Sequence, residues 1–166
     1  MTTTGLRHEL EKRIAQMQAI GHDAPLERFL LENGRDFQVA RFEGQMMPAK
    51  RCFKNALQYA GRRGFRYAEG FAISGTLLSS GIVFPVHHAW CVDEDGNAVD
   101  PTWGDSEAGR YFGMDFDVRE VLKRVTGKES YGMFVTGRLG IVDLDYLKSL
   151  DPEFFVFERR LAVPPV

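Results

Sequence analysis

The chain is poor in cysteine, has no excess of charge of either sign and lacks long apolar runs. Its two cysteines, Cys52 and Cys91, are too few for a disulfide framework, so we expect both to be thiols. Lysine and arginine number 21 against 23 aspartates and glutamates, a balance that gives no overall attraction to nucleic acid or to an anionic membrane. We therefore predict neither nucleic acid nor a membrane as a partner.

Segments that would export the chain or insert it into a bilayer are also missing. Residues 1–13 are polar and then amphipathic, without the apolar run and small-residue cleavage site of a secretory signal. No apolar stretch approaches the roughly 18 residues needed to span a membrane. We find no internal repeat and no low-complexity tract. From these absences we expect a cytoplasmic protein.

The composition that remains is that of an ordinary globular domain. Hydrophobic residues make up 44% of the chain and charged residues 27%, and the 13 phenylalanines supply bulky apolar surface for a core. A length of 166 residues is enough for one such core and short for two. We predict one domain over residues 1–166, with an N-terminal helical cover (1–45), a core that carries the motifs (46–103) and a C-terminal α/β flank (104–166).

Hydrophobic periodicity divides the chain into helices and strands. Apolar residues at three- and four-residue steps predict helices over residues 6–20, 25–33, 52–60, 118–125 and 142–150. Alternation predicts strands over residues 65–73, 82–92 and 98–100, and brief extended segments over 37–39 and 154–157. Glycine content predicts a loose hairpin over residues 75–81 and an aromatic loop over 102–116. The pattern favours an α+β fold.

Three residues in the order cysteine, histidine, aspartate have the chemistry of an activated thiol. Cys52 stands at the start of a predicted helix, where the helix dipole and the flanking Lys50 and Arg51 favour the thiolate. His88 lies on a predicted strand, and we expect the cysteine helix to pack across the strand face that carries it. The hairpin turn that follows brings Asp100 alongside, where it can orient the imidazole. The sequence thus predicts a catalytic triad, although Asp100 also fits a turn or capping acid.

Four further residues are candidates to line a substrate site, and each has a structural alternative: Trp90, Asn55, Glu69 and Tyr111. Trp90 fits either a wall of the site or a core residue, and Asn55 fits either the site or a local cap. Glu69 fits a solvent-facing strand residue better than a second acid. Tyr111 belongs to an aromatic segment that can form a substrate wall or cover the core.

These motifs resemble the transglutaminase-like superfamily, which is related to the papain-like cysteine proteases. The matching segments are Cys52-Phe53-Lys54-Asn55-Ala56, Tyr67-Ala68-Glu69-Gly70-Phe71-Ala72, His88-Ala89-Trp90 and Val99-Asp100-Pro101-Thr102. The resemblance implies a nucleophile helix packed on an antiparallel β-sheet. It also implies a thiol protease, isopeptidase, deamidase or transglutaminase that attacks an amide of a protein or peptide through a thioester, without a cofactor.

Other assignments stay open or are disfavoured. The backbone amide of Cys52 is a candidate oxyanion donor. Gln45 is a second candidate, because its place seven residues before the cysteine is similar to that of a glutamine in papain-like enzymes. No cysteine or histidine pair has the short spacing of a zinc site, so we predict no metal. The alternative function is a binding or sequestering module that retains the fold without turnover, such as a phage or mobile-element effector. The oligomeric state is left open.

Overall fold

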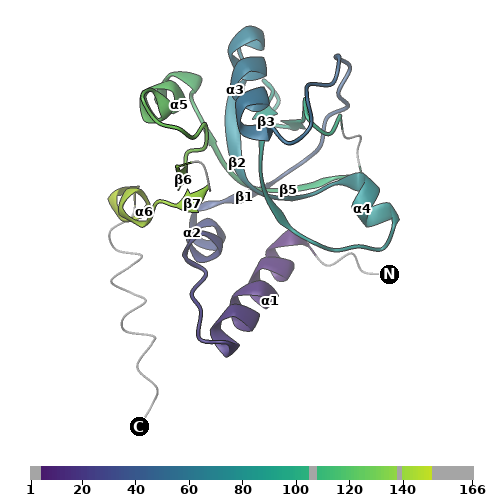
Figure 1. Cartoon of the computed structure of the whole chain (residues 1–166). Coiled ribbons are helices and arrows are strands. Elements are labelled where there is room, and N and C mark those ends of the chain that lie inside the picture. Colours follow the sequence, from purple (N-terminus) through teal and green to yellow (C-terminus); the bar gives the residue numbers. More distant parts are fainter. Residues whose placement is uncertain (1–4, 105–107, 138–139, 151–166) are drawn as a thin grey trace.

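A five-stranded antiparallel sheet with strand order β1-β5-β2-β3-β4 lies at the centre of the protein (Figure 1). The computed structural model describes residues 5–104, 108–137 and 140–150. The strands of this sheet are β1 (Arg35–Phe37), β2 (Arg66–Ile73), β3 (Val86–Val92), β4 (Ala98–Val99) and β5 (Arg110–Phe116). A separate hairpin pairs β6 (Val135–Thr136) with β7 (Ile141–Val142). The helices are α1 (Leu6–Ala19), α2 (Pro25–Asn33), α3 (Cys52–Arg63), α4 (Gly75–Ser79), α5 (Val118–Val125) and α6 (Leu144–Leu150).

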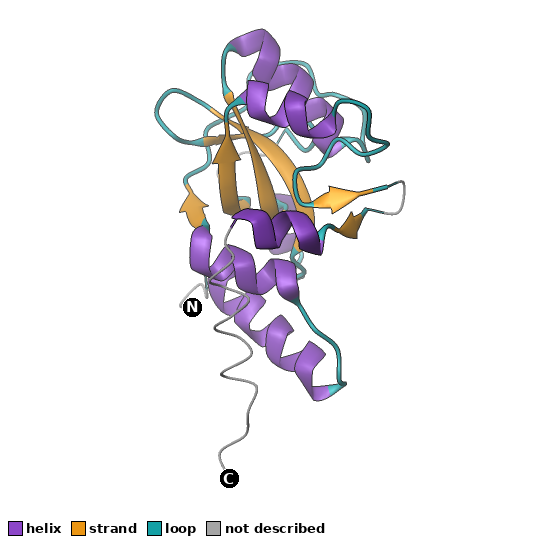
Figure 2. Cartoon of the chain, turned by 90° about the vertical axis from the view of Figure 1, so that its left-hand side faces the viewer, coloured by secondary structure: helices purple, strands orange, loops and turns teal. Residues whose placement is uncertain are grey.

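The sheet separates two hydrophobic clusters of unequal size. The larger cluster joins side chains from α1, α2, α3, α5 and α6 to one face of the sheet, including Leu6, Phe29, Leu57, Val121 and Leu147. The smaller cluster lies on the opposite face, around Phe37, Trp90 and Tyr111, with Val39 and Trp103 from loops packed against it. Figure 2 shows the strands between two groups of helices. This arrangement confirms the predicted α+β class and the antiparallel sheet.

Helix α3 forms where its pattern predicts and stops for an identifiable reason. Ala56, Leu57 and Ala60 are buried at helical spacing, which turns one side of the helix to the sheet. Gly64 follows the last helical residue with a φ of 70°, the left-handed conformation that glycine adopts without strain. The helix therefore begins at Cys52, as the sequence predicts, and ends on a glycine cap.

Two predictions about the connections were wrong. The segment predicted as a loose hairpin contains helix α4, because the Ser74 hydroxyl accepts a hydrogen bond from the Leu77 amide at 3.3 Å and caps it. The predicted aromatic loop contains β5, a central strand. Its Gly113 lies opposite Gly70, and a side chain on either glycine would collide with the neighbouring backbone, so these glycines serve close strand approach rather than a loop.

The boundaries of other segments differ less. Strand β3 begins at Val86, so residues 82–85 of the predicted strand lie outside the observed one. Residues 154–157, predicted as extended, lie outside the described residues. The longest described helix, α1, has 14 residues, and none of the described helices has the length and hydrophobicity of a membrane-crossing segment.

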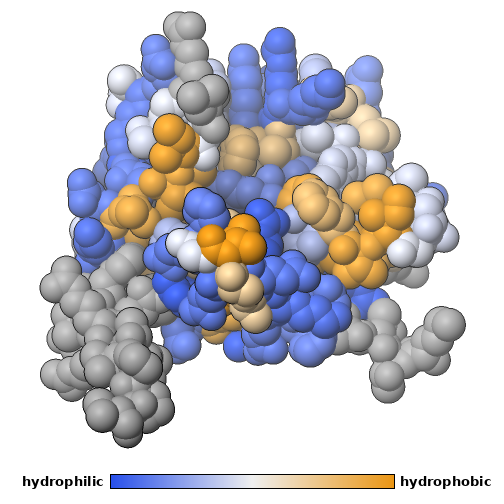
Figure 3. Space-filling model, turned by 60° about the horizontal axis from the view of Figure 1, so that its bottom comes forward, coloured by the Kyte–Doolittle hydropathy of each residue, from blue (hydrophilic) through white to orange (hydrophobic). Residues whose placement is uncertain are grey.

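Apolar side chains that the core leaves exposed gather in separate patches among hydrophilic surface (Figure 3). One consecutive run consists of Ile82, Val83 and Phe84, which are 49%, 50% and 58% exposed. This run ends at buried Pro85, directly before the strand that carries His88. The chain that leads into β3 is therefore an exposed apolar loop.

Candidate active site

Cys52 is the first residue of α3 and is partly exposed. Because it lies in the first turn, its amide N–H has no acceptor within the helix. Lys50, two residues earlier, has a φ of 63° and is the one non-glycine residue in the described part of the chain with a positive φ. The chain therefore enters the helix through an unusual backbone conformation, and the thiol and its amide N–H share one end of α3.

His88 and Asp100 form a buried pair beside this helix end. His88 Nε2 lies 2.7 Å from Asp100 Oδ2, and the two residues are 2% and 0% exposed. The hairpin between β3 and β4 produces this contact, because Cys91 pairs with Val99 and Asp100 follows directly along the chain. The predicted approach of Asp100 to His88 is present in the structure.

Asp100 accepts hydrogen bonds on both carboxylate oxygens. The Tyr111 hydroxyl donates to Oδ2 at 2.9 Å, the same oxygen that faces His88. The backbone amides of Thr102 and Trp103 donate to Oδ1 at 2.8 and 3.1 Å. Asp100 is thus a turn acid as well as the partner of the histidine, so the two alternatives left by the sequence hold together.

The contacts of His88 favour its charged form. Burial lowers the pKa of His88, but hydrogen bonds to the Asp100 and Cys52 side chains and the charges of both outweigh burial and raise that pKa to about 9. Burial acts in the opposite sense on Asp100, yet the bond and charge of His88 and the amides of Trp103 and Thr102 lower its pKa. Because Nε2 is bonded to Asp100, Nδ1 is the ring nitrogen that remains for a proton from the thiol.

Helix α3 does not pack across the strand face that carries His88, as the sequence led us to expect. The Cys91 thiol donates to the Ala56 carbonyl of α3 at 3.2 Å, so the helix covers the face of β3 that carries Cys91. His88 lies on the opposite face with Trp90, by strand alternation. Cys52 meets His88 because it stands at the end of the helix rather than on its packed side.

Trp103 is a site residue that sequence reasoning missed. Its ring stacks on the His88 imidazole with centroids 3.7 Å apart and an interplanar angle of 10°. Trp103 is half-buried, so it covers one face of the imidazole and restricts the ring's rotation. The signal available in the sequence was an aromatic residue directly after the Asp100-Pro101-Thr102 motif.

The four candidate lining residues are all buried, and Glu69 lies apart from the other three, on the other face of the sheet. Trp90 and Glu69 are 0% exposed, Tyr111 is 1% and Asn55 is 2%. The structure therefore does not place them on a surface that a substrate can reach, and the expectation of a solvent-facing Glu69 is wrong. Tyr111 holds Asp100, and Trp90 packs in the smaller core cluster.

Asn55 connects the loops on either side of the site. Its Nδ2 donates to the Pro48 carbonyl at 2.8 Å and to the Thr102 hydroxyl at 3.0 Å. The Met47 amide also donates to the Pro101 carbonyl, at 2.7 Å. These bonds tie the segment before Cys52 to the segment after Asp100.

Gln45 lies in the same loop and is exposed. In the part of the chain that the structure describes, no recorded hydrogen bond joins its side chain to Cys52 or His88. Gln45 stays a candidate oxyanion donor on its position alone, whereas the backbone amide of Cys52 belongs to the same residue as the thiol.

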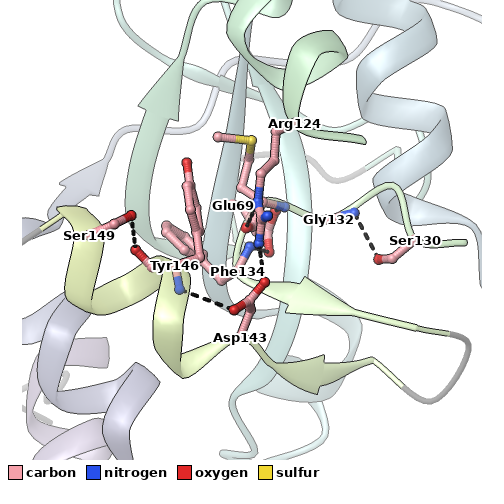
Figure 4. Close-up of polar contacts among 9 residues, drawn as sticks. Glu69, Arg124, Ser130, Gly132, Phe134, Asp143, Tyr146 and Ser149 are labelled. Atoms are coloured by element: carbon pink, nitrogen blue, oxygen red, sulfur yellow. Dashed lines mark hydrogen bonds and ion pairs between the residues drawn. The ribbon is translucent and has the colours of Figure 1, made fainter. Parts of the chain in front are cut away.

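Glu69 is a second buried carboxylate, on the opposite face of the sheet with Tyr67 and Phe71 of the larger cluster. Figure 4 shows its surroundings. Glu69 accepts from the Tyr67 hydroxyl at 2.7 Å and from the amides of Met133 and Phe134 at 2.5 and 3.2 Å. His87 Nε2 lies 2.9 Å from Glu69 Oε1, so this histidine is structurally bonded. Glu69 thereby attaches the segment after α5 to strand β2.

Arg124 extends this attachment toward α6. Its guanidinium donates to the Met133 carbonyl at 3.2 Å and to the Asp143 carboxylate at 2.5 Å (Figure 4). Asp143 in turn accepts from the Tyr146 amide at 3.0 Å, in the first turn of α6. Among the described residues, no group of three histidine, cysteine or acidic side chains is arranged to hold a metal ion.

The site brings together a partly exposed thiol, an imidazole with a raised pKa and a buried carboxylate. Comparisons of this chain with protein-family models, with curated proteins and with solved structures find no match. The inference of function therefore depends on the geometry of the site.

Proposed function

We propose that this protein is a cysteine-dependent amide hydrolase or acyltransferase of the transglutaminase-like type, acting on a protein or peptide. Cys52 is the nucleophile, His88 exchanges protons with it, and Asp100 orients and charges the imidazole. The observation that carries the proposal is the buried His88–Asp100 pair, 2.7 Å apart, with the Cys52 side chain close enough to contribute to the raised pKa of His88. We also propose that the α+β fold is, more specifically, of the papain- or transglutaminase-like kind.

The first half of the reaction forms a thioester. The Cys52 sulfur attacks the carbonyl carbon of the amide, and the carbonyl oxygen takes the negative charge near the Cys52 amide N–H. The His88 imidazolium then gives its proton to the amide nitrogen, the C–N bond breaks, and ammonia or an amine leaves. The raised pKa of His88 supplies this proton at neutral pH.

The second half releases the acyl group. Water or a second amine attacks the thioester carbon while neutral His88 takes a proton from the attacking group. The C–S bond breaks, and the sulfur leaves as the thiolate that starts the next cycle. Asp100 stays ionised throughout, because its carboxylate is held by four donors.

The proposal is tested by the pH dependence of Cys52 alkylation with iodoacetamide, followed by intact mass in a Cys91→Ser background. We expect rapid alkylation at neutral pH that falls about tenfold or more in His88→Ala. The exposed His22 provides the control, since His22→Ala should react like the parent protein. Slow alkylation of the parent protein, unchanged by His88→Ala, would show that the three residues are structural.

A further inference from the structure

A cavity of about 460 Å³ opens at the start of α3, and although Cys52 itself is not in its lining, the residues on either side of Cys52 are. Its lining includes Arg51 and Phe53, the two chain neighbours of the cysteine, and Lys54 in the next position of α3. The segment between α5 and β6 forms the opposite wall, with Glu129 and Tyr131. A cavity of this size holds one or two amino-acid side chains, and the chain neighbours Arg51 and Phe53 place it within one residue of the proposed nucleophile.

The charge of the lining is predominantly positive. Lys50, Arg51 and Lys54 contribute three cations against the single carboxylate of Glu129. Among the described residues, the structure records no ion pair for these three cations. The fold holds Lys50 at a φ of 63°, a conformation that residues with a side chain seldom adopt.

Aromatic side chains supply the apolar part of the lining. Phe53 is half-buried and packs against the His87 ring at a centroid distance of 5.1 Å. Tyr131 is 44% exposed, and Lys54 Nζ lies 5.8 Å from the centroid of its ring. The lining therefore combines apolar walls with cations, which suits a side chain that has an aliphatic stem and an anionic end.

We infer that this cavity binds an acidic residue of the peptide substrate, next to the amide that Cys52 attacks. The inference rests on the proposed function and adds a substrate class to it. A glutamate or aspartate side chain places its methylenes against Phe53 and Tyr131 and its carboxylate among Lys50, Arg51 and Lys54. Nucleic acid is disfavoured as the ligand, since the whole chain has a net charge of -2.

The inference is tested with two peptide chloromethyl ketones that are identical except for one residue, glutamate in the first and glutamine in the second. Their rates of Cys52 labelling are compared by intact mass in the Cys91→Ser protein. We expect the glutamate probe to react about tenfold faster at low salt, and the ratio to fall as salt screens the cavity. Lys50→Gln with Lys54→Gln should bring the ratio close to one, whereas Lys12→Gln with Lys123→Gln, outside the cavity, should leave it unchanged.

A binding measurement separates this inference from the proposed function. The corresponding unreactive peptides are titrated into Cys52→Ala by calorimetry, with a single-stranded oligonucleotide as competitor. Tighter binding of the glutamate peptide, lost in the double lysine variant, supports the inference even if Cys52 proves unreactive. Equal labelling of a reactive Cys52 by both probes would overturn the inference and leave the proposed function standing. Displacement of the peptide by the oligonucleotide at lower concentration would also overturn it.

Discussion

At the residue scale, Asp100 sets the chemistry of the site through its charge. Its carboxylate faces the imidazole on one oxygen and is held by two backbone amides on the other. The amides fix the position of the carboxylate, and the negative charge raises the pKa of His88 despite burial. The effects of the position and of the charge of this side chain can therefore be separated by Asp100→Asn, because asparagine has nearly the same shape as aspartate and no charge.

We predict that Asp100→Asn lowers the pKa of His88 from about 9 toward its ordinary value of 6.5. The amide keeps a hydrogen-bond acceptor but loses the charge that stabilises the imidazolium. A pH titration of the His88 ring by NMR measures the change, and alkylation of Cys52 at neutral pH should slow with it. Tyr111→Phe is the control, since it removes a donor to Asp100 and keeps the charge. An unchanged His88 titration in Asp100→Asn would contradict this account of the pair.

The second buried carboxylate, that of Glu69 on the other face of the sheet, acts on structure rather than on the thiol. It is fully buried and is satisfied by Tyr67, His87 and two backbone amides. The bonds from the two backbone amides, of Met133 and Phe134, reach across 64 and 65 positions of sequence, so no local pattern signals them. This long separation explains why the sequence suggested a solvent-facing residue.

At the element scale, Glu69 should decide whether the segment after α5 stays attached to the sheet. We predict that Glu69→Gln destabilises the protein by about 2–4 kcal/mol, because the buried donors around it lose their charged acceptor. Hydrogen exchange at the Met133 and Phe134 amides should speed up more than exchange in the central sheet. Tyr67→Phe removes one donor and should cost about 1 kcal/mol. Unchanged exchange at both amides in Glu69→Gln would refute the attachment.

Gly113 in β5 and Gly61 in α3 provide a second test, because a side chain fits at Gly61 and not at Gly113. A Cβ at Gly113 would lie 2.3 Å from the Glu69 carbonyl oxygen, so Gly113→Ala should cost at least about 3 kcal/mol by forcing β5 from β2. Gly61 lies inside α3, where a Cβ would meet only Val118 at 3.9 Å. Gly61→Ala should therefore stabilise the protein by about 0.5–1 kcal/mol. Urea unfolding of both variants measures the two changes, and equal effects would contradict the assigned roles.

The sequence predicts elements whose pattern is local and misses those that depend on distant partners. Helix α5 occupies the predicted range, and α3 begins at the predicted Cys52, because the amphipathic spacing that defines each helix lies within its own segment. Strand β5 was missed because Gly113 is explained only by Gly70 across the sheet. The approach of Asp100 to His88 was predictable from a short hairpin. The stacking of Trp103 was not, since it depends on how the following loop folds back.

At the scale of the whole molecule, the buried pair links stability to pH. His88 has a raised pKa, so its stabilising contribution is complete below about pH 6.5 and is lost as the pH rises through about 9. Asp100 has a lowered pKa, so its contribution is present above about pH 3.8 and is lost as the pH falls further. The stabilising contributions of both residues are therefore complete only between about pH 3.8 and about pH 6.5.

We predict that the difference in unfolding free energy between the parent protein and His88→Gln decreases from about pH 6 to about pH 9.5. The decrease should be at most about 3 kcal/mol, since one pKa unit corresponds to about 1.4 kcal/mol. Urea unfolding at the two pH values measures it, and the His22→Gln difference should stay constant. A difference that grows with pH would have the wrong sign for a raised His88 pKa.

The most direct test of the central claim is whether Cys52 carries an acyl group and then releases it. The protein is mixed with p-nitrophenyl acetate, while nitrophenol release is followed by absorbance and the adduct by intact mass and peptide mapping. We predict a burst of nitrophenol, one acetyl group on Cys52, and steady turnover that stops in Cys52→Ala and slows at least about a hundredfold in His88→Ala. Nitrophenol release that is no faster than in Cys52→Ala, or an acetyl group that leaves equally slowly with and without His88, would contradict the proposed acyl-transfer site.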